Sequence, residues 1–269
     1  MTPAPVAIGA LGGSGTRVVA RLVRAAGVEM GGVLNGADDN LVFSLLIKRP
    51  RWLIRADLAA VSERLAIFAA HMGGERLGLR ARATVLRSLL NDLAMPRREA
   101  LRAARGALRR REAPTGTWGW KEPNTHLVLD ALSSAFPRLG YIHVIRHGID
   151  LAFGANTQQL VAFGPLFGID PAVGPRPVAQ LDYWIRANRR ALDLGPRRLG
   201  ERFHLLRYDE LVANPATIAG ELFSFLGANP TGAASAAHEV CSPSPSPTRD
   251  LSVFRPDQLE AVERLGFTL

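Results

Sequence analysis

The segment of residues 12–17, GGSGTR, combines glycines with small hydroxyl side chains, as is typical of an anion-binding loop. An apolar run, VAIGA, precedes it and a helical pattern follows it, and glycine-rich turns in this setting bind phosphate through backbone N–H groups. A Walker-type loop has lysine directly before its closing Ser or Thr, but here Thr16 follows Gly15. Val18 stands where a dinucleotide-binding loop has its third glycine. The loop therefore predicts a different anion, or a tight turn without a ligand.

Two further expected strand ends carry side chains that suit an anionic ligand. Arg146 follows the apolar run GYIHVI, and its planar guanidinium matches phosphate or carboxylate, with Asp150 as a helix cap or charge partner. Tyr208 closes the run RFHLLRY and can bond a phosphate oxygen. Arg17 falls in the first turn of a helix, where a cation is favoured only if an anion lies nearby; the alternative is a side chain that turns into solvent. His147 is either a catalytic base or a hydrogen-bonding residue of the turn.

The elements that must position these residues alternate along the chain. Beyond the first strand, we expect strands at 117–121, 140–145 and 202–208 and helices at 125–135, 148–160, 178–194 and from Pro215 to just before Gly227. This alternation predicts parallel βαβ units around a central sheet. Open parallel sheets bind ligands at the carboxyl ends of their strands, so the three groups of polar residues are expected to meet at that edge.

The whole chain, residues 1–269, is expected to form a single α/β domain with a central parallel β-sheet flanked by helices. Residues 55–111 predict a helical insertion, and residues 164–177, rich in Gly and Pro, predict a surface loop or lid over the site. Residues 229–249 are small and polar and predict a flexible, extended segment. A short helix near 256–264 closes the chain.

The composition favours anionic partners, because 33 basic residues against 24 acidic ones give a net charge of +9. The densest arginine cluster, residues 96–112, has no nucleic-acid motif and no interleaved aromatic side chains, so we expect a solvated helix or a general positive field and no nucleic-acid partner. No apolar run is long enough to span a bilayer, and no basic leader precedes the first one, which predicts a cytoplasmic protein without stable membrane insertion. The single cysteine, Cys241, excludes an internal disulfide and a cysteine-based zinc site.

In this order the motifs resemble those of the sulfotransferases that use 3′-phosphoadenosine-5′-phosphosulfate. That family's first loop, a basic residue followed by S-G-T, is matched by residues 14–16, and its second motif, an arginine with an aspartate four residues later, by Arg146 and Asp150. Its third segment, YEDL-x-x-NP, is similar to YDELVANP at residues 208–215, and its K-x-P segment is similar to KEP at residues 121–123. The resemblance implies a P-loop-like sulfotransferase fold.

Two positions depart from the family pattern. Gly13 stands where the family usually has its basic residue, and Gly154 stands where a serine usually helps to hold the 3′-phosphate. Arg17 or Lys121 is a candidate to supply the missing cation, and Asn156, or a serine from elsewhere in the chain, is a candidate to replace the missing hydroxyl.

The resemblance implies transfer of a sulfuryl group from this donor to a hydroxyl or amine of a small-molecule, glycan or lipid acceptor, with 3′-phosphoadenosine-5′-phosphate as product. We expect Lys121 to stabilise the leaving phosphate, and Glu122, with His126 as second candidate, to remove the acceptor proton, since both follow a strand end beside that lysine. No metal is expected at the site. The expected donor-binding residues are Gly12, Gly13, Ser14, Gly15, Thr16, Arg17, Arg146, Gly154 and Tyr208.

Two other functions stay open. A nucleotide-dependent kinase or phosphotransferase requires magnesium ligands and a lysine in the loop. A non-catalytic nucleotide- or anion-binding module on the same fold is favoured by the two departures from the family pattern. No motif indicates the identity of the acceptor or the oligomeric state.

Overall fold

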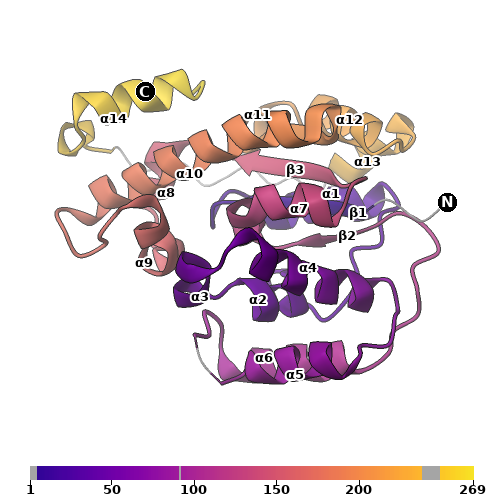
Figure 1. The fold of residues 1–269 in the computed structure, drawn as a ribbon. Helices are drawn as coiled ribbons and strands as arrows, with labels where there is room; N and C mark the ends of the chain where they lie inside the picture. Colours follow the sequence, from indigo (N-terminus) through magenta and orange to yellow (C-terminus); the bar gives the residue numbers. More distant parts are fainter. Residues whose placement is uncertain (1–4, 91, 238–248) are drawn as a thin grey trace.

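The computed structural model describes residues 5–90, 92–237 and 249–269, and its centre is a four-stranded parallel sheet (Figure 1). The strand order is β2-β1-β3-β4, where the bounds are β1 Pro5–Ala10, β2 Trp118–Lys121, β3 Gly140–Ile145 and β4 Phe203–Arg207. Every residue of β1 is buried, as expected for a central parallel strand covered on both faces. The predicted fold class, one α/β domain with a parallel sheet flanked by helices, is confirmed.

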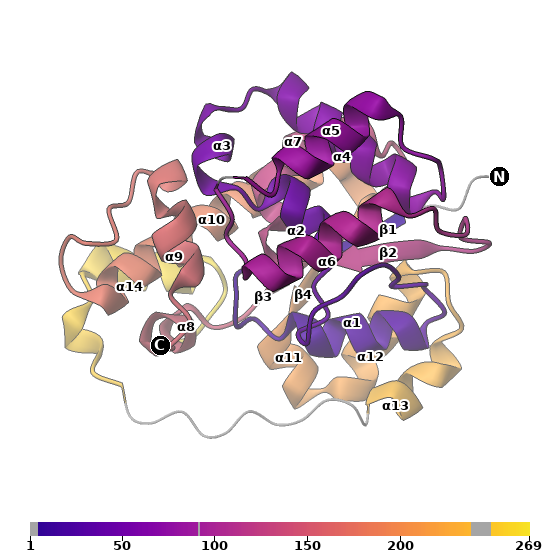
Figure 2. The same ribbon diagram turned by 90° about the horizontal axis from the view of Figure 1, so that it is seen from below.

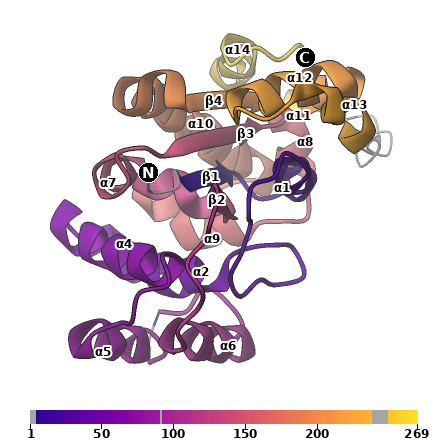
Figure 3. The ribbon, with the colours of Figure 1, turned by 90° about the vertical axis from the view of Figure 1, so that its right-hand side faces the viewer.

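Side chains that alternate along the strands separate the two faces of the sheet. Ile8, Ile142 and Leu206 pack with one set of helices, whereas Ala7 and Tyr141 pack with the other. On the first face lie α1 (Thr16–Ala25), α12 (Pro215–Phe225) and α13 (Ala233–Ala236), and on the second lie α7 (Leu129–Ala135) and α10 (Arg176–Leu199). Figure 3 shows α1 and α7 on opposite sides of the strands.

The chain between β1 and β2 builds further helical layers below the sheet, as Figures 1 and 3 show. These helices are α2 (Leu41–Ile47), α3 (Pro50–Arg55), α4 (Leu58–Met72), α5 (Leu79–Arg87) and α6 (Arg97–Leu108). Helix α2 is apolar apart from Ser44 and buried at every position, and Asn40 caps its start by accepting hydrogen bonds from the amides of Val42 and Phe43. Since α2 contacts both α4 and α6, it joins the inner layer to the outer one.

One predicted helix was wrong. The expected helix at 148–160 is two short helices, α8 (Gly148–Phe153) and α9 (Gln158–Phe163). The break begins at Gly154, whose φ of −63° and ψ of 154° are extended and end the helical hydrogen bonding. The four residues between the two helices lead the chain toward the glycine loop, where Asn156 and Gln159 approach Gly12.

The other boundaries were predicted more closely. The bounds of β3 and of the last helix, α14 (Pro256–Arg264), are those expected from the sequence, but α10 is five residues longer at its carboxyl end than predicted. The expected helix at 125–135 begins with a 3-10 turn, η1 (Pro123–Val128). The remaining elements are η2 (Gly164–Phe167), η3 (Gly200–Arg202), α11 (Tyr208–Ala213), η4 (Pro230–Gly232) and η6 (Leu251–Val253).

The segment expected to be flexible, 229–249, is described only in part. Its first residues form η4 and α13, and residues 238–248, Cys241 among them, lie outside the described residues. Among the helices that are described, none combines the length and the apolar composition needed to cross a membrane.

Candidate active site

The four strands bring the predicted motifs to one edge of the sheet. The glycine loop follows β1, Glu122 follows β2, Arg146 follows β3 and Tyr208 follows β4. All three strand pairings are parallel, so these four strand ends point the same way. The edge expected from the sequence is therefore the place where the polar residues meet.

The glycine loop wraps closely around the start of α1. Gly13 and Gly15 have φ values of 93° and 84°, the left-handed region that favours glycine. A Cβ on Gly15 would lie 2.1 Å from Cε2 of Tyr208, so this glycine also lets the tyrosine ring contact the loop. Ser14 and Thr16 are buried within the turn. The Val18 amide donates to the Gly15 carbonyl at 3.0 Å, whereas the amides of Thr16 and Arg17 precede the first helical acceptor, as at any helix start, which is the arrangement that binds anions.

Arg146 connects the loop to two other segments. Its Nη1 donates a hydrogen bond to the Gly13 carbonyl at 3.2 Å, and its Nη2 lies 3.2 Å from Asp150 Oδ2. Its guanidinium carbon lies 5.7 Å from the centre of the Tyr208 ring. Its Nε is buried and has no hydrogen-bond partner in the described part of the chain, so this arginine keeps an unused donor beside the loop.

A second arginine, Arg249, joins this group and was not predicted from the sequence. Its Nη1 forms an ion pair with Oδ1 of Asp150, so one carboxylate holds both Arg146 and Arg249. Burial, followed by the positive charge of Arg146, lowers the pKa of Arg249. Two guanidinium groups that share one carboxylate carry a net positive charge, which favours an anionic ligand.

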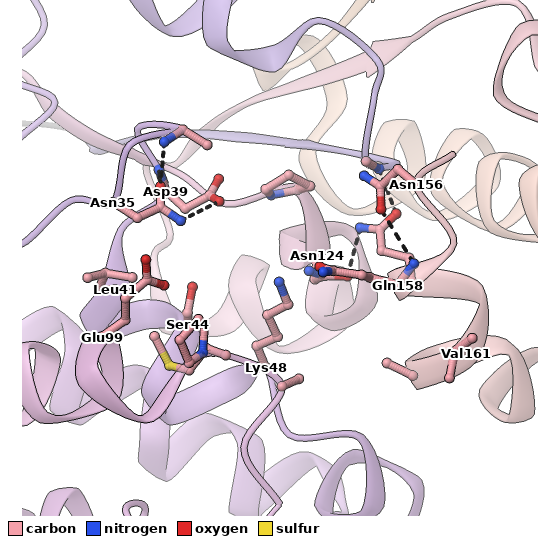
Figure 4. Close-up of a pocket in the computed structure, with 18 of the residues that line it drawn as sticks. Asn35, Asp39, Leu41, Ser44, Lys48, Glu99, Asn124, Asn156, Gln158 and Val161 are labelled. Carbon is pink, nitrogen blue, oxygen red and sulfur yellow. Dashed lines mark hydrogen bonds between the residues drawn. The ribbon is translucent and has the colours of Figure 1, made fainter. Parts of the chain in front are cut away.

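A cavity of about 750 Å³ opens next to the loop at Gly12 (Figure 4). Its walls come from the loop before α2, from α2, η1 and α6, and from the start of α9, and they combine polar and apolar side chains. The side chains that define its chemistry are Asn35, Asp39, Ser44, Lys48, Glu99, Asn124, Asn156, Gln158 and Gln159. In Figure 4 the side chain of Lys48 points toward Asn124, which makes it a cation that faces the cavity.

Glu122 lies behind the wall of this cavity. Its side chain is fully buried, Oε2 accepts a hydrogen bond from the Asn124 amide at 2.7 Å, and Oε1 accepts one from Asn124 Nδ2 at 3.0 Å. Lys48 Nζ lies 3.5 Å from the same Oε1. Burial is the main cause that raises the pKa of Glu122, and the nearby Asp39 also raises it, whereas Lys48 lowers it. Glu122 does not line the cavity itself; it contacts Lys48 and Asn124, which do.

Lys121, the predicted cation, is held by other groups. Its Nζ lies 2.6 Å from Asp39 Oδ1 and donates a hydrogen bond to the Ala37 carbonyl at 2.8 Å, and its side chain is buried. The contacts of Lys121 fix the polar loop that forms one wall of the cavity. Lys48, which follows the apolar run of α2, is the lysine that lines the cavity.

His126, the second predicted base, is not brought to the cavity. Its ring is fully buried, and neither ring nitrogen has a hydrogen-bond partner among the residues that the structure describes. Burial, with smaller contributions from His143 and Arg190, lowers its pKa well below the usual value and keeps it neutral. Its ring centre lies 6.4 Å from that of His143 on the covered face of the sheet.

A chain of side-chain hydrogen bonds joins the glycine loop to Glu122. The Gly12 amide donates to Gln159 Oε1 at 2.6 Å, and Gln159 Nε2 donates to Asn124 Oδ1 at 2.8 Å. Asn124 in turn donates to Glu122. Gln159 therefore couples the loop to the buried carboxyl group, and no sequence motif had singled it out.

The remaining predicted residues have clear positions. Arg17 is exposed and points away from the buried side of α1. Gly154 is the C-cap of α8, at the opposite end of that helix from Arg146. His147 is a hydrogen-bonding residue of the turn: its Nδ1 accepts from the Ile149 amide and its Nε2 donates to the Thr268 carbonyl. Within the described ranges, no cluster of three or more acidic, histidine or cysteine side chains could hold a metal ion.

Comparison with known proteins assigns the family of this chain. A family model described as "Sulfotransferase family" matches residues 5–231. The chain belongs to the sulfotransferase family, as the resemblance of its motifs had indicated. A search of the curated proteins found no match.

Several solved structures are similar to this chain. A sulfotransferase from Mycobacterium tuberculosis shares 16% identity, with 88% of this chain and 71% of that chain covered and a TM-score of 0.47. The sulfotransferase domain of the Synechococcus PCC 7002 olefin synthase shares 17% identity over 100% of this chain and 96% of that one, with a TM-score of 0.46. The sulfotransferase domain from the curacin biosynthetic pathway shares 14% identity over 100% and 99%, with a TM-score of 0.49. These are distant similarities, and the assignment of the chain to the sulfotransferase family rests on the family model.

Proposed function

We propose that this protein transfers a sulfuryl group from 3′-phosphoadenosine-5′-phosphosulfate to a hydroxyl or amine of a small acceptor. The observation that supports this most is the meeting of the glycine loop, Arg146 and Tyr208 at one sheet edge, beside a cavity that Lys48 lines. An anion-binding loop without a lysine suits a phosphosulfate, because the group transferred carries less charge than a terminal phosphate of ATP.

The residues at this edge fit the nucleotide donor. The backbone of residues 13–16 and the first turn of α1 would hold the 5′-phosphosulfate. Arg146, with its unused buried Nε, and Arg249 would hold the 3′-phosphate, and Asp150 would fix the positions of both arginines. When bound, the donor supplies an activated sulfuryl group, and 3′-phosphoadenosine-5′-phosphate is the product.

In this proposal the Lys48–Glu122 pair handles the acceptor proton. A carboxyl group with a raised pKa is a better base near neutral pH than an ordinary carboxylate, and burial raises the pKa of Glu122 in this way. Lys48 faces the cavity, and its Nζ lies 3.5 Å from Glu122 Oε1. The Lys48 ammonium group gives one proton to the Glu122 carboxylate and takes the acceptor proton in its place, so that Lys48 is charged again and Glu122 is left protonated. The positive charge of Lys48 also stabilises charge that develops on the leaving phosphate.

Substitution of Arg146 tests the donor assignment. A hydrogen bond to a charged group contributes roughly 1.5–3 kcal/mol, or about 10–150-fold in affinity. We expect Arg146→Ala to weaken 3′-phosphoadenosine-5′-phosphate by this factor and to leave the binding of adenosine 5′-phosphate, which lacks the 3′-phosphate, nearly unchanged. Calorimetric titration with both ligands measures the two affinities.

The matched control is Arg55→Ala, which removes an exposed arginine of α3 and should change neither affinity. Equal weakening of both ligands by Arg146→Ala would mean that Arg146 supports the sheet edge and does not contact the 3′-phosphate.

A further inference from the structure

The positive charge of the molecule is concentrated in one segment. Residues 76–111 contain eleven arginines against two acidic residues, Asp92 and Glu99, so their net charge of +9 equals that of the whole chain. The same segment contains no Phe, Trp or Tyr. The proposed reaction uses none of these arginines, and they require a separate explanation.

This segment forms the outermost layer of the protein. Helices α5 and α6 lie farthest from the sheet in Figures 1 and 3, and they lie near the viewer in Figure 2, which shows the molecule from below. Ala100, Ala103, Ala104 and Ala107 are buried on the inner side of α6. The exposed side chains of residues 79–90 and 97–109 form the opposite side, which we call the α5–α6 face.

Large apolar side chains lie among the arginines on the α5–α6 face. Leu79 is 87% exposed, Leu86 51% and Leu90 71%, and their spacing of seven and four residues places them along one side of α5 and the turn that follows it. Leu101 on α6 is 53% exposed. An ordinary solvated helix face exposes charged or polar residues, so this alternation of leucine and arginine indicates a bound partner with both apolar and anionic groups.

We propose that the α5–α6 face docks the protein on an anionic lipid surface. At the boundary of a bilayer, leucine side chains enter the acyl region, while arginine side chains extend to the lipid phosphates. Each arginine near an anionic membrane raises the affinity about fivefold. A nucleic acid is a poorer fit, because single strands require aromatic side chains for stacking and exposed leucines find no partner on a phosphate backbone.

The position of the cavity agrees with such docking. Pro96 and Glu99, at the start of α6, line the cavity and also border the α5–α6 face. Docking through this face therefore brings one wall of the cavity next to the lipid head groups. The docking itself does not depend on the proposed sulfuryl transfer, because it rests only on the charge and exposure of α5 and α6.

Sedimentation of the full chain with lipid vesicles tests this proposal. We expect binding to phosphatidylcholine vesicles that contain about one third phosphatidylglycerol, with an affinity that falls as salt rises, and no binding to phosphatidylcholine alone. Absence of binding to the anionic vesicles at low salt would overturn the proposal.

Arginine substitutions locate the surface. The triple variant Arg98→Gln, Arg105→Gln and Arg109→Gln should weaken binding on the order of 100-fold. The control replaces Arg176, Arg189 and Arg197, exposed on α10, and should leave binding nearly unchanged although it lowers the net charge equally. Equal losses in the two triple variants would overturn the proposal, because the effect would then follow net charge and not this face.

Leucine substitutions distinguish a membrane from a water-soluble polyanion. The variant Leu79→Ser with Leu90→Ser should weaken vesicle binding roughly tenfold or more, because two apolar side chains leave the acyl region. Val173→Ser, at a 69% exposed position in the loop before α10, is the control. Unchanged binding in the double leucine variant would show an electrostatic partner without an apolar part and would overturn the proposal. Thermal melting of every variant verifies that it is folded.

Discussion

Arg146 contacts the Gly13 carbonyl, the Asp150 carboxylate and the Tyr208 ring, groups that belong to three separate segments of the chain. This explains why an arginine at the end of β3 could be identified from sequence: a strand end fixes the position of its side chain at the sheet edge. Lys48, Gln159 and Arg249 could not be identified in this way. Each reaches the site from a helix end or a loop, where no periodic pattern indicates what the side chain contacts.

Replacement of the single residue Glu122 tests the proposal that this side chain receives the acceptor proton. We expect Glu122→Gln to lower turnover on the order of 10²–10⁴-fold, which is typical when a general base is removed, and to leave the affinity for 3′-phosphoadenosine-5′-phosphate nearly unchanged. Glutamine retains the shape of the side chain, and its one oxygen can accept one of the two hydrogen bonds that Asn124 donates, so the fold should persist. Rates from initial-velocity kinetics and affinities from calorimetry separate the two effects. Turnover within about threefold of the unmodified chain would exclude Glu122 as the base.

At the scale of elements, the close contact between the start of α1 and the start of α11 depends on one glycine. Gly15 combines a φ of 84° with a position where a Cβ would overlap the Tyr208 ring. We expect Gly15→Ala to lower the free energy of unfolding by about 2–5 kcal/mol, the sum of left-handed strain and overpacking. Gly220→Ala in α12, where a Cβ meets nothing within 4 Å, should raise it by about 0.5–1 kcal/mol. Urea denaturation measures both values, and a stable Gly15→Ala variant would show that the loop relaxes without cost.

The strands were predictable because each is a short apolar run that ends at polar residues. The division of residues 148–163 into α8 and α9 was not predictable, since GIDLAFGANTQQLVAF supports helix locally on both sides of Gly154. The break matters for the site, because the segment after it carries Asn156 and Gln159 to the glycine loop. Tertiary contacts with Gly12 and Asn124 decide this path, and such contacts leave no mark in the local sequence.

For the whole molecule, buried histidines make the fold sensitive to acid. Burial lowers the pKa of His143 from 6.5 to about 4, and burial with the nearby Arg111 lowers that of His71 to about 4. Between these pH values the unfolded chain binds protons that the folded chain does not, so the free energy of unfolding decreases as the pH falls from 6.5 to about 4. The loss is on the order of 3 kcal/mol for the fully buried His143.

Urea denaturation near neutral pH and near pH 4 measures this loss in the free energy of unfolding. Glu122, whose pKa is raised, acts in the opposite direction, because its contribution to stability falls as the pH rises through its raised pKa. The variant His143→Gln cannot titrate and should lose less stability than the unmodified chain over the same pH interval. An equal loss in both proteins would assign the acid sensitivity to other groups.

At the scale of the whole molecule, the carboxyl edge of the sheet is the expected binding site of the sulfuryl donor. Calorimetric titration of the unmodified protein with 3′-phosphoadenosine-5′-phosphate and with adenosine 5′-phosphate measures this most directly. The two guanidinium groups at Asp150 should recognise the 3′-phosphate. We therefore predict that the first ligand binds at least about 10-fold more tightly than the second, without added metal. Equal affinity for the two nucleotides, or no binding of either, would contradict the assignment of this site to a sulfuryl donor.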